Sequence, residues 1–317
     1  MFFRKLGFFG VCALMGTTIF SVNPALVNAQ SVTEVATGSP IQINWLQALI
    51  LGLIQGLTEF LPISSTAHLT VIPQLFGWGK PGVAYIAVIQ LGSIAAIIWY
   101  FWQDLSQITM GMLKAIRTKD YSSLEFKLAL GIGLGTLPII FLGLLVKIFV
   151  PDLDNSPLHS LTTIAIASIV MSLLLALAEK VGTHRRPFEK LRWQDGVVMG
   201  FAEAMAIIPG VSRSGSTLTA GLFINLERAT AARFSFLLGI PAITLAGLVQ
   251  LKDAFKAGFS GETVFPLVIG VISAAFFSYL AIAWLLKYLQ KNNTWVFIWY
   301  RLAFGILILL SSFVKFP

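Results

Sequence analysis

Ionisable side chains occur in two strongly apolar stretches of the sequence. The stretch QGLTEFLPISSTAHL contains Glu59 and His68, and the stretch AEAMAIIPGVSRSGST contains Glu203 and Arg213. A charged side chain at the centre of a membrane-spanning helix costs about 2.5–3.5 kcal/mol on insertion scales, so such residues usually face an interior cavity and mark a functional site. We therefore expect the chemistry of this protein to lie in these two stretches.

Hydroxyl side chains crowd the same two stretches. A simple ion pair between Glu59 and Arg213 would neutralise two buried charges without any hydroxyl nearby. A phosphate group, in contrast, is bound by an always-charged guanidinium, by short hydroxyl donors and by the backbone amides at helix N-termini. The segment PGVSRSGST is therefore predicted to form an anion-binding turn. The predicted phosphate-binding residues are Gln55, Ser64, Ser212, Arg213, Ser214 and Thr217.

Cleavage of a phosphoanhydride requires a phosphate anchor, a nucleophile or activated water, and a group that transfers protons. Glu59 shares a helix face with Gln55 and would bind a divalent cation, Mg²⁺ or Ca²⁺, or act as a base. Ser65 would attack phosphorus or orient it, and His68 would transfer a proton. The candidate catalytic residues are Glu59, Ser65, His68 and Arg213, and Glu59 is also the candidate metal ligand. A covalent intermediate on Ser65 and direct attack by water remain alternatives.

The composition of the chain is that of a helical membrane protein. Of its 317 residues, 56% are hydrophobic and only 11% are charged, which is outside the range of soluble globular domains. The formal net charge is +8, but the basic residues lie in short loops between apolar runs and form no single basic patch. The charge therefore indicates membrane topology and predicts no nucleic-acid partner.

The first 29 residues have the layout of a secretory signal. Arg4 and Lys5 precede an apolar run, and small residues follow up to Ala29. Cleavage there would leave residues 30–317 as a single membrane domain. The alternative is an uncleaved first transmembrane helix, because the apolar run is long for a signal. Cys12 is the only cysteine, so a cleaved product would have no disulfide and no cysteine metal site.

Six apolar runs are long enough to span a bilayer, which takes about twenty residues. Two further apolar stretches, 44–77 and 193–227, are each broken near the centre by a proline and a polar cluster. Proline interrupts a helix and serine is a good N-cap for a new one, so each stretch reads as two helices joined by a turn. We interpret both as re-entrant hairpins, because non-helical backbone at membrane depth needs protein or a watery cavity around it. The six predicted spans are 81–103, 127–150, 158–178, 231–251, 264–286 and 295–316.

The two broken stretches resemble each other in the spacing of a glycine, a polar residue and the Pro/Ser turn. Each is followed by three predicted spans, so the second hairpin would enter from the opposite face. This predicts an all-α polytopic membrane protein with six transmembrane helices plus two re-entrant helical hairpins arranged as an inverted repeat, about 44–178 and 192–316. Basic residues concentrate near 114–119, 180–192 and 287–291, which places those loops in the cytoplasm. The site would then open to the outer face of the membrane.

The two motifs together closely resemble the signature motifs of the undecaprenyl-diphosphate phosphatase family, also called the bacitracin-resistance protein family. The resemblance extends over nearly all of residues 44–316. It implies an integral membrane hydrolase that removes the terminal phosphate of undecaprenyl diphosphate, the lipid carrier of cell-wall synthesis, with a divalent cation. The expected partners are this lipid and the membrane, bacitracin only through the shared lipid, and a second copy in a homodimer. The residues that match the family motifs by position are Glu59, Ser65, His68, Ser212, Arg213 and Thr217.

Gln55 departs from the pattern, because some members of that family have a second Glu there. This counts against a mechanism with paired carboxylates in the first motif, although a neutral amide can still bind phosphate or metal. Transport is the competing function, since inverted repeats with broken helices are typical of secondary transporters and a lipid-phosphate flippase could use the same anion-binding turn. A transporter has no evident need of Ser65 and His68 beside an acid, so the sequence favours hydrolysis.

Overall fold

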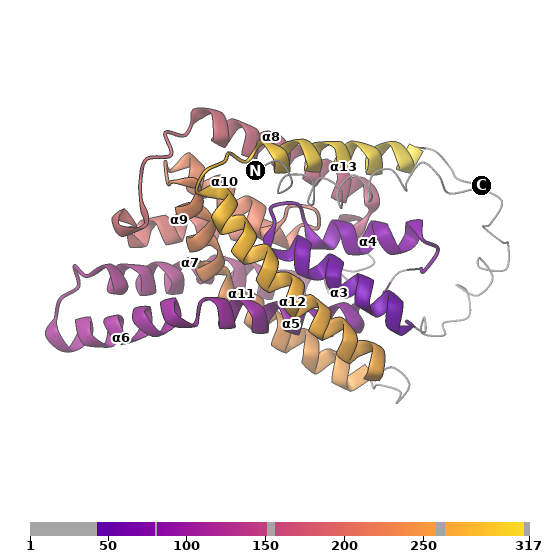
Figure 1. Cartoon of the computed structure of the whole chain (residues 1–317), viewed down its shortest axis with the longest axis horizontal. Coiled ribbons are helices and arrows are strands. Elements are labelled where there is room, and N and C mark those ends of the chain that lie inside the picture. Colours follow the sequence, from indigo (N-terminus) through magenta and orange to yellow (C-terminus); the bar gives the residue numbers. More distant parts are fainter. Residues whose placement is uncertain (1–42, 80, 151–155, 258–263, 314–317) are drawn as a thin grey trace.

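The computed structural model is all-helical over the residues that it describes, which are 43–79, 81–150, 156–257 and 264–313. Within those ranges no strand forms, and the one isolated bridge joins Arg186 to Leu226. The signal peptide predicted for the first 29 residues lies outside the described part of the chain. Figure 1 shows the helices crossing one another at several angles.

Two helix–turn–helix units contain the polar motifs. The first consists of α3 (Trp45–Phe60) and α4 (Ser65–Leu75), and the second of α9 (Trp193–Ala204), a short 3-10 turn and α10 (Arg213–Phe223). Residue numbers at matching points of the two units differ by 148, both where the first helices begin and at both ends of the second helices. The resemblance of the two stretches therefore extends to their local structure.

The turns of the two units have the same backbone conformation at the serine that precedes the second helix. Ser64 has φ 75° and ψ 100°, and Ser212 has φ 68° and ψ 114°. Each hydroxyl accepts from the amide three residues later, Ala67 at 3.4 Å and Gly215 at 3.2 Å. Serine is a favoured N-cap, but a positive φ outside glycine is strained by about 1–3 kcal/mol and occurs mostly at functional sites.

Long apolar helices surround the two units. Four are long and apolar enough to cross a membrane: α7 (Leu124–Phe149), α8 (Leu161–Val181), α11 (Arg228–Ala257) and α12 (Val264–Leu289). A further candidate is the pair α5 (Val83–Tyr100) and α6 (Trp102–Thr118), which bends by 63°. The last helix, α13 (Trp295–Phe313), is apolar but shorter. The described residues thus hold four to five spans by length and composition, and each predicted span overlaps one of these helices.

Helix α6 is an element that the sequence analysis did not predict. It was expected to be the loop after the first span, yet residues 102–118 are helical. Ile108 and Ala115 on one face are buried, and Asp104 forms an ion pair with Arg233 of α11. The helix is amphipathic and only moderately apolar, so its hydropathy alone does not mark it as a span of its own.

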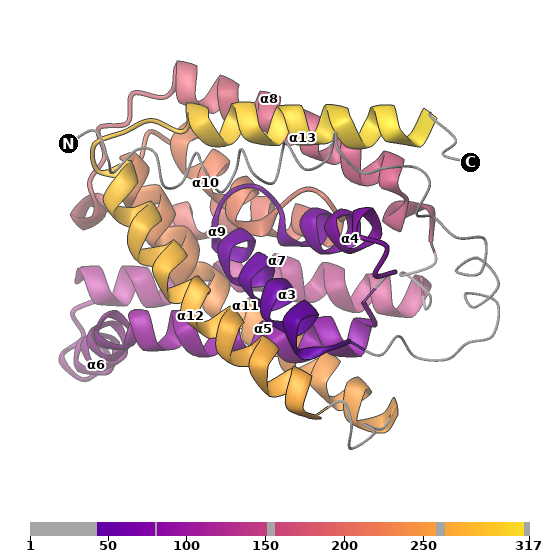
Figure 2. The ribbon, with the colours of Figure 1, turned by 45° about the vertical axis from the view of Figure 1, so that its right-hand side comes forward.

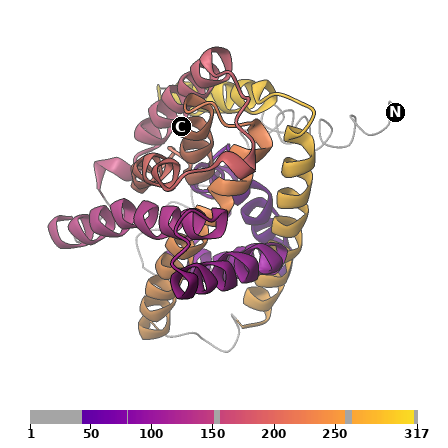
Figure 3. The same cartoon turned by 90° about the vertical axis from the view of Figure 1, so that its left-hand side faces the viewer.

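The first helix of each unit packs mainly against a helix from the other half of the chain. Helix α3 packs on α12, and α9 packs on α7. Glycines allow the close approach: a Cβ added at Gly200 would lie 1.9 Å from the carbonyl oxygen of Gly135, and one at Gly52 would lie 2.4 Å from that of Gly270. Figure 2 shows α12 passing in front of α3, and Figure 3 shows the indigo α3 near the centre of the helices. Both units are thereby enclosed by the long helices.

The outward faces of the long helices are apolar. Phe141, Ile148 and Phe276 are 66%, 67% and 58% exposed, and they belong to a large set of exposed apolar side chains. Soluble proteins rarely expose contiguous apolar surface on this scale. The chain is therefore a multi-pass membrane protein.

Candidate active site

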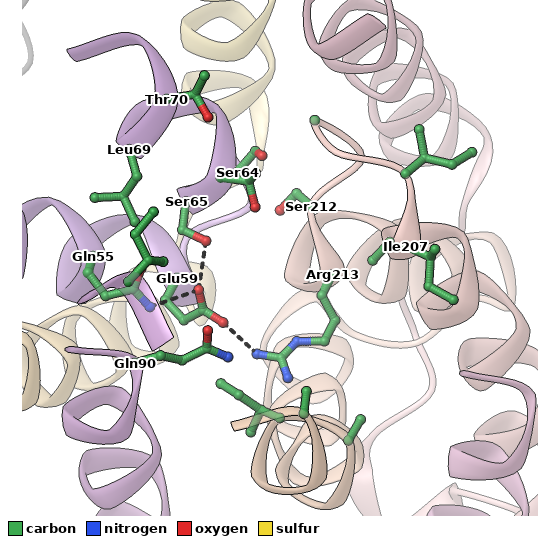
Figure 4. A pocket seen from close by; sticks show the side chains of 18 of the residues that line it. Gln55, Glu59, Ser64, Ser65, Leu69, Thr70, Gln90, Ile207, Ser212 and Arg213 are labelled. Carbon is green, nitrogen blue, oxygen red and sulfur yellow. Dashed lines mark hydrogen bonds and ion pairs between the residues drawn. The ribbon is translucent and has the colours of Figure 1, made fainter. Parts of the chain in front are cut away.

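A cavity of about 240 Å³ lies where the two units meet. Its lining comes from the last turns of α3, from both serine-containing turns, and from α5, α7 and α11 (Figure 4). Six of the predicted site residues line it, namely Gln55, Glu59, Ser64, Ser65, Ser212 and Arg213. Three others do not, namely His68, Ser214 and Thr217. The structure thus brings together polar side chains that are far apart in the sequence.

Glu59 is the acceptor at the centre of this cavity. Arg213 Nη2 donates to Glu59 Oε1 at 2.9 Å, and Ser65 Oγ donates to Oε2 at 2.6 Å. Gln55 Nε2 also donates to Oε2, at 3.2 Å. The Arg213 and Glu59 side chains are only 17% and 11% exposed. The carboxylate is therefore held in one orientation by donors from both units.

Two helix N-termini point at the same cavity. Helix α4 begins at Ser65 and α10 begins at Arg213, and both first residues line the cavity. The first amides of a helix have no acceptor within the helix, and they carry a partial positive charge that attracts anions. Together with the guanidinium, these two helix ends give the cavity the groups that attract an anion such as phosphate.

Gln55 is oriented by two serines that the sequence analysis did not identify. Its Nε2 lies 3.5 Å from the hydroxyl of Ser93 on α5, which in turn accepts from Ser278 of α12 at 2.9 Å. Both serines are fully buried. They lie in apolar helices without any local motif, so only the packing of α3 against α5 and α12 shows their role.

His68 lies behind the first turn rather than in the cavity. Its Nδ1 is 2.7 Å from the carbonyl oxygen of Ser64, and since a carbonyl only accepts, Nδ1 is the donor. Its Nε2 is 2.8 Å from the hydroxyl of Tyr300, and its ring stacks on Phe304 with centroids 4.3 Å apart. Both ring nitrogens are therefore occupied by protein groups, and His68 fixes the turn that carries Ser64.

Ser214 and Thr217 are buried supports for the second turn. Ser214 Oγ donates to the carbonyl of Leu61 at 3.0 Å, which joins the two turns directly. Thr217 Oγ1 donates to the carbonyl of Arg213 at 2.8 Å and is 2.5 Å from the hydroxyl of Ser235. These contacts orient α10, and of the second turn's predicted site residues only Ser212 and Arg213 line the cavity.

Arg301 is a buried cation of the site that the sequence analysis missed. It is fully buried on α13, and its Nη2 donates to the carbonyls of Gly210 and Val211, the latter at 2.6 Å. These carbonyls belong to the second turn, so Arg301 holds that turn from behind. The signal was present in WVFIWYRLAFG, an apolar run with one arginine, to which the rule for intramembrane charges applies.

The residues that line the cavity fit a divalent cation only together with a phosphate ligand. Glu59 is the acid among them, and in the described part of the chain no cluster of three or more His, Cys, Asp and Glu side chains forms. Mg²⁺ is commonly held by one or two carboxylates plus substrate phosphates, with water completing its shell. One carboxylate beside an anion site meets that requirement, whereas a cage made of protein ligands alone does not form.

Comparison with known proteins agrees with the motifs. The family model described as bacitracin resistance protein BacA matches residues 48–307. An undecaprenyl-diphosphatase from a Synechocystis species is 66% identical over 289 residues, which cover 91% of this chain and 89% of that protein. The undecaprenyl-diphosphatases of Trichormus variabilis and Synechococcus elongatus are 59% and 58% identical, over 97% and 87% of this chain and 96% of each relative. The chain therefore belongs to the bacitracin resistance protein BacA family.

Proposed function

We propose that this protein is an integral membrane hydrolase that removes the terminal phosphate of undecaprenyl diphosphate and so regenerates undecaprenyl phosphate for cell-wall synthesis. Membership of the family and the undecaprenyl-diphosphatase activity of relatives up to 66% identical support this activity. The observation that carries the proposal is the meeting of Arg213 and Ser65, from separate units, on the one carboxylate of Glu59. Bacitracin resistance follows from the faster recycling of the lipid that bacitracin binds.

The geometry suggests a division of roles among the lining residues. Arg213 and the first amides of α4 and α10 bind the terminal phosphate, and Glu59 accepts a proton from Ser65 or from a water molecule. The oxygen so activated attacks the terminal phosphorus, the bond from phosphorus to the bridging oxygen breaks, and undecaprenyl phosphate leaves. If Ser65 attacks, water then hydrolyses the phosphoserine to release inorganic phosphate.

A divalent cation, Mg²⁺ or Ca²⁺, would neutralise part of the diphosphate charge, and Glu59 would hold it as the alternative to its role as the base. Ser64 and Ser212 donate to phosphate oxygens from opposite turns, and the Gln55 amide keeps Glu59 in place. His68 has an indirect role in this mechanism, in place of the predicted proton transfer. Because His68 binds the Ser64 carbonyl and Tyr300, its part in the reaction is to position the turn.

The proposed architecture is a single membrane domain, residues 30–317, with six transmembrane helices and two re-entrant hairpins in an inverted repeat. Its repeats are residues 44–178 and 192–316. Three findings support it: the constant offset of 148 between the units, the shared conformation of Ser64 and Ser212, and the packing of α3 and α9 on helices of the opposite half. An inverted repeat places a shared site between the two halves, near the middle of the membrane.

In the plasma membrane the cavity would open to the periplasmic face, with the lipid tail remaining between the helices. The basic residues of the loops near 114–119, 180–192 and 287–291 support this orientation. Labelling of a cysteine introduced at Thr66, which lines the cavity, tests it when the reagent is applied to each side in turn. A homodimer remains a prediction that cross-linking in native membranes would test.

The activity is tested by phosphate release from undecaprenyl diphosphate by the purified protein in detergent, with Mg²⁺, with Ca²⁺ and with a chelator. We expect release that depends on the cation and is lost in Glu59→Ala and Arg213→Ala. Release that persists in both folded variants would contradict the site assignment. Absence of release, combined with uptake of polyprenyl phosphate by vesicles containing the protein, would favour transport instead.

A further inference from the structure

Glu203 on α9 is a fully buried acid with an unusual environment. Its exposed fraction is 0%, and neither carboxylate oxygen has a hydrogen-bond partner among the residues that the structure describes. Other buried acids are well satisfied. Glu179 accepts from Arg228 and from the hydroxyl of Thr294 at 2.7 Å, and Asp195 accepts from Arg186 at 2.6 and 3.1 Å. Glu203 therefore lacks the contacts that a structural carboxylate has elsewhere in this protein.

Arg213 is a cation close to Glu203, because both side chains approach Gly239 of α11. A Cβ built on Gly239 would be 3.4 Å from Arg213 Nη1 and 3.5 Å from Glu203 Oε1. The guanidinium donates through Nη2 to Glu59 and through Nη1 to the carbonyl of Gly239. Arg213 thus lies near two carboxylates. Glu59 lines the cavity and accepts from the guanidinium, whereas Glu203 accepts no hydrogen bond from the described residues.

The position of Glu203 corresponds to that of Gln55 in the first unit. Gln55 and Glu203 are 148 residues apart, which is the offset between the two units, and Ser65 and Arg213 are separated by the same number. In the first unit, Gln55 donates to Glu59 beside Ser65. In the second unit, the equivalent helix position supplies a carboxylate beside Arg213. The first motif of this chain lacks a second acid because Gln55 stands where some family members have Glu. An acid is present instead at the equivalent position of the second unit, Glu203.

A buried carboxylate without donors destabilises the fold, so its presence at this place indicates a use in the reaction. We propose that Glu203 is a positioning residue, the second anionic partner of Arg213, which holds the guanidinium when the diphosphate displaces it from Glu59. This inference rests on the proposed function, because it assumes that a phosphate oxygen replaces Glu59 as the acceptor from Arg213 Nη2. Glu59 is then free to accept a proton, and Glu203 together with the Gly239 carbonyl keeps the charge of Arg213 directed at the phosphate.

The isosteric substitution Glu203→Gln tests this inference, because it removes the charge and keeps the shape. We expect kcat for undecaprenyl diphosphate to fall about tenfold while KM changes much less, as for an interaction needed in the transition state. The Tm of the variant in detergent should be equal to or above that of the wild type, since a buried carboxylate that accepts no hydrogen bond is replaced by a neutral amide. Glu203→Asp, which keeps the charge, should retain more activity than Glu203→Gln.

A double-mutant cycle separates positioning from a general effect on folding. In the Arg213→Lys background, Glu203→Gln should lower kcat by much less than tenfold, because the group that it positions has changed. Glu179→Gln is the matched control: it removes a buried carboxylate that has donors, so it should lower Tm and leave the kcat of the folded protein unchanged.

Three results would overturn the inference. The first is wild-type kcat and KM in Glu203→Gln, and the second is a loss of activity in proportion to a loss of Tm. The third is an effect on kcat that is the same in the Arg213→Lys background. Failure of the wild-type protein to release phosphate would be distinguishable from these, because it would contradict the proposed function itself.

Discussion

Arg213 donates to Glu59 at 2.9 Å across 154 residues of sequence, and this contact joins two units that are each incomplete. The first unit provides the carboxylate and the serine that donates to it, but no cation among its cavity-lining residues. The second provides the cation and a serine turn. Because the two groups are already paired, the proposed mechanism requires a phosphate to compete with Glu59 for the guanidinium, and this competition would release the carboxylate for use as a base.

Arg213→Lys should lower kcat/KM by about 100-fold or more, although it keeps the positive charge. Lysine lacks the planar fork with which Arg213 binds Glu59 and the Gly239 carbonyl together. Phosphate release in detergent measures the effect. The control is Arg233→Lys, a change in an arginine that pairs with Asp104 away from the cavity; equal losses in both variants would contradict a specific role for Arg213.

Ser212→Ala should destabilise the protein by about 1 kcal/mol, whereas Ser212→Gly should be close to neutral. Alanine loses the cap on the Gly215 amide and keeps the strained positive φ, but glycine adopts that φ without strain. Thermal unfolding in detergent gives the order of stability. An alanine variant as stable as the glycine variant would show that the backbone strain does not matter there, and an alanine variant as stable as the wild type would show the same for the cap and the strain together.

Gln55→Glu should lower the Mg²⁺ concentration needed for half-maximal activity by about tenfold. The substitution replaces a donor to Glu59 by a second carboxylate, and affinity for a divalent cation rises with the number of charged ligands. Titration of phosphate release with Mg²⁺ measures it, with Gln55→Ala as the control that removes the donor without adding charge. An unchanged Mg²⁺ requirement would mean that the cation binds elsewhere.

Two glycines of α7 that are two residues apart should respond in opposite ways to alanine. A Cβ at Gly135 would lie 2.3 Å from the carbonyl oxygen of Gly196, so Gly135→Ala should separate α7 from α9 and cost about 1–3 kcal/mol. Gly133 has no atom within 4 Å of an added Cβ, so Gly133→Ala should be neutral or stabilising by up to about 1 kcal/mol. Thermal unfolding distinguishes them, and similar effects would argue against tight packing of α7 on α9.

The broken helices could be predicted because their signals are local. Pro62 and Pro209 interrupt the helices, and Ser64 and Ser212 cap the next ones. The six apolar runs were readable for the same reason, since hydropathy needs no knowledge of neighbours. Helix α6 could not be found this way, because its buried face is complementary to other helices rather than to lipid.

The roles of individual site residues were harder to predict because they depend on packing. His68 has the spacing expected of a side chain in the cavity, but Tyr300 and Phe304 of α13 hold its ring behind the turn. Ser93 comes from a helix that has no motif at all. The sequence identified which types of residue the site contains, while the helices that enclose it decide which of them contact a ligand.

The packing of α3 on α12 and of α9 on α7 also constrains how the chain is made. As synthesis proceeds from the N-terminus, α3 and its polar turn are made more than two hundred residues before α12 is complete. Arg213, the partner of Glu59, is made only after most of that interval has passed. In the re-entrant arrangement proposed above, the first unit would therefore be an incomplete polar segment in the bilayer during biogenesis, and the insertion machinery would have to shield it until the second half is made.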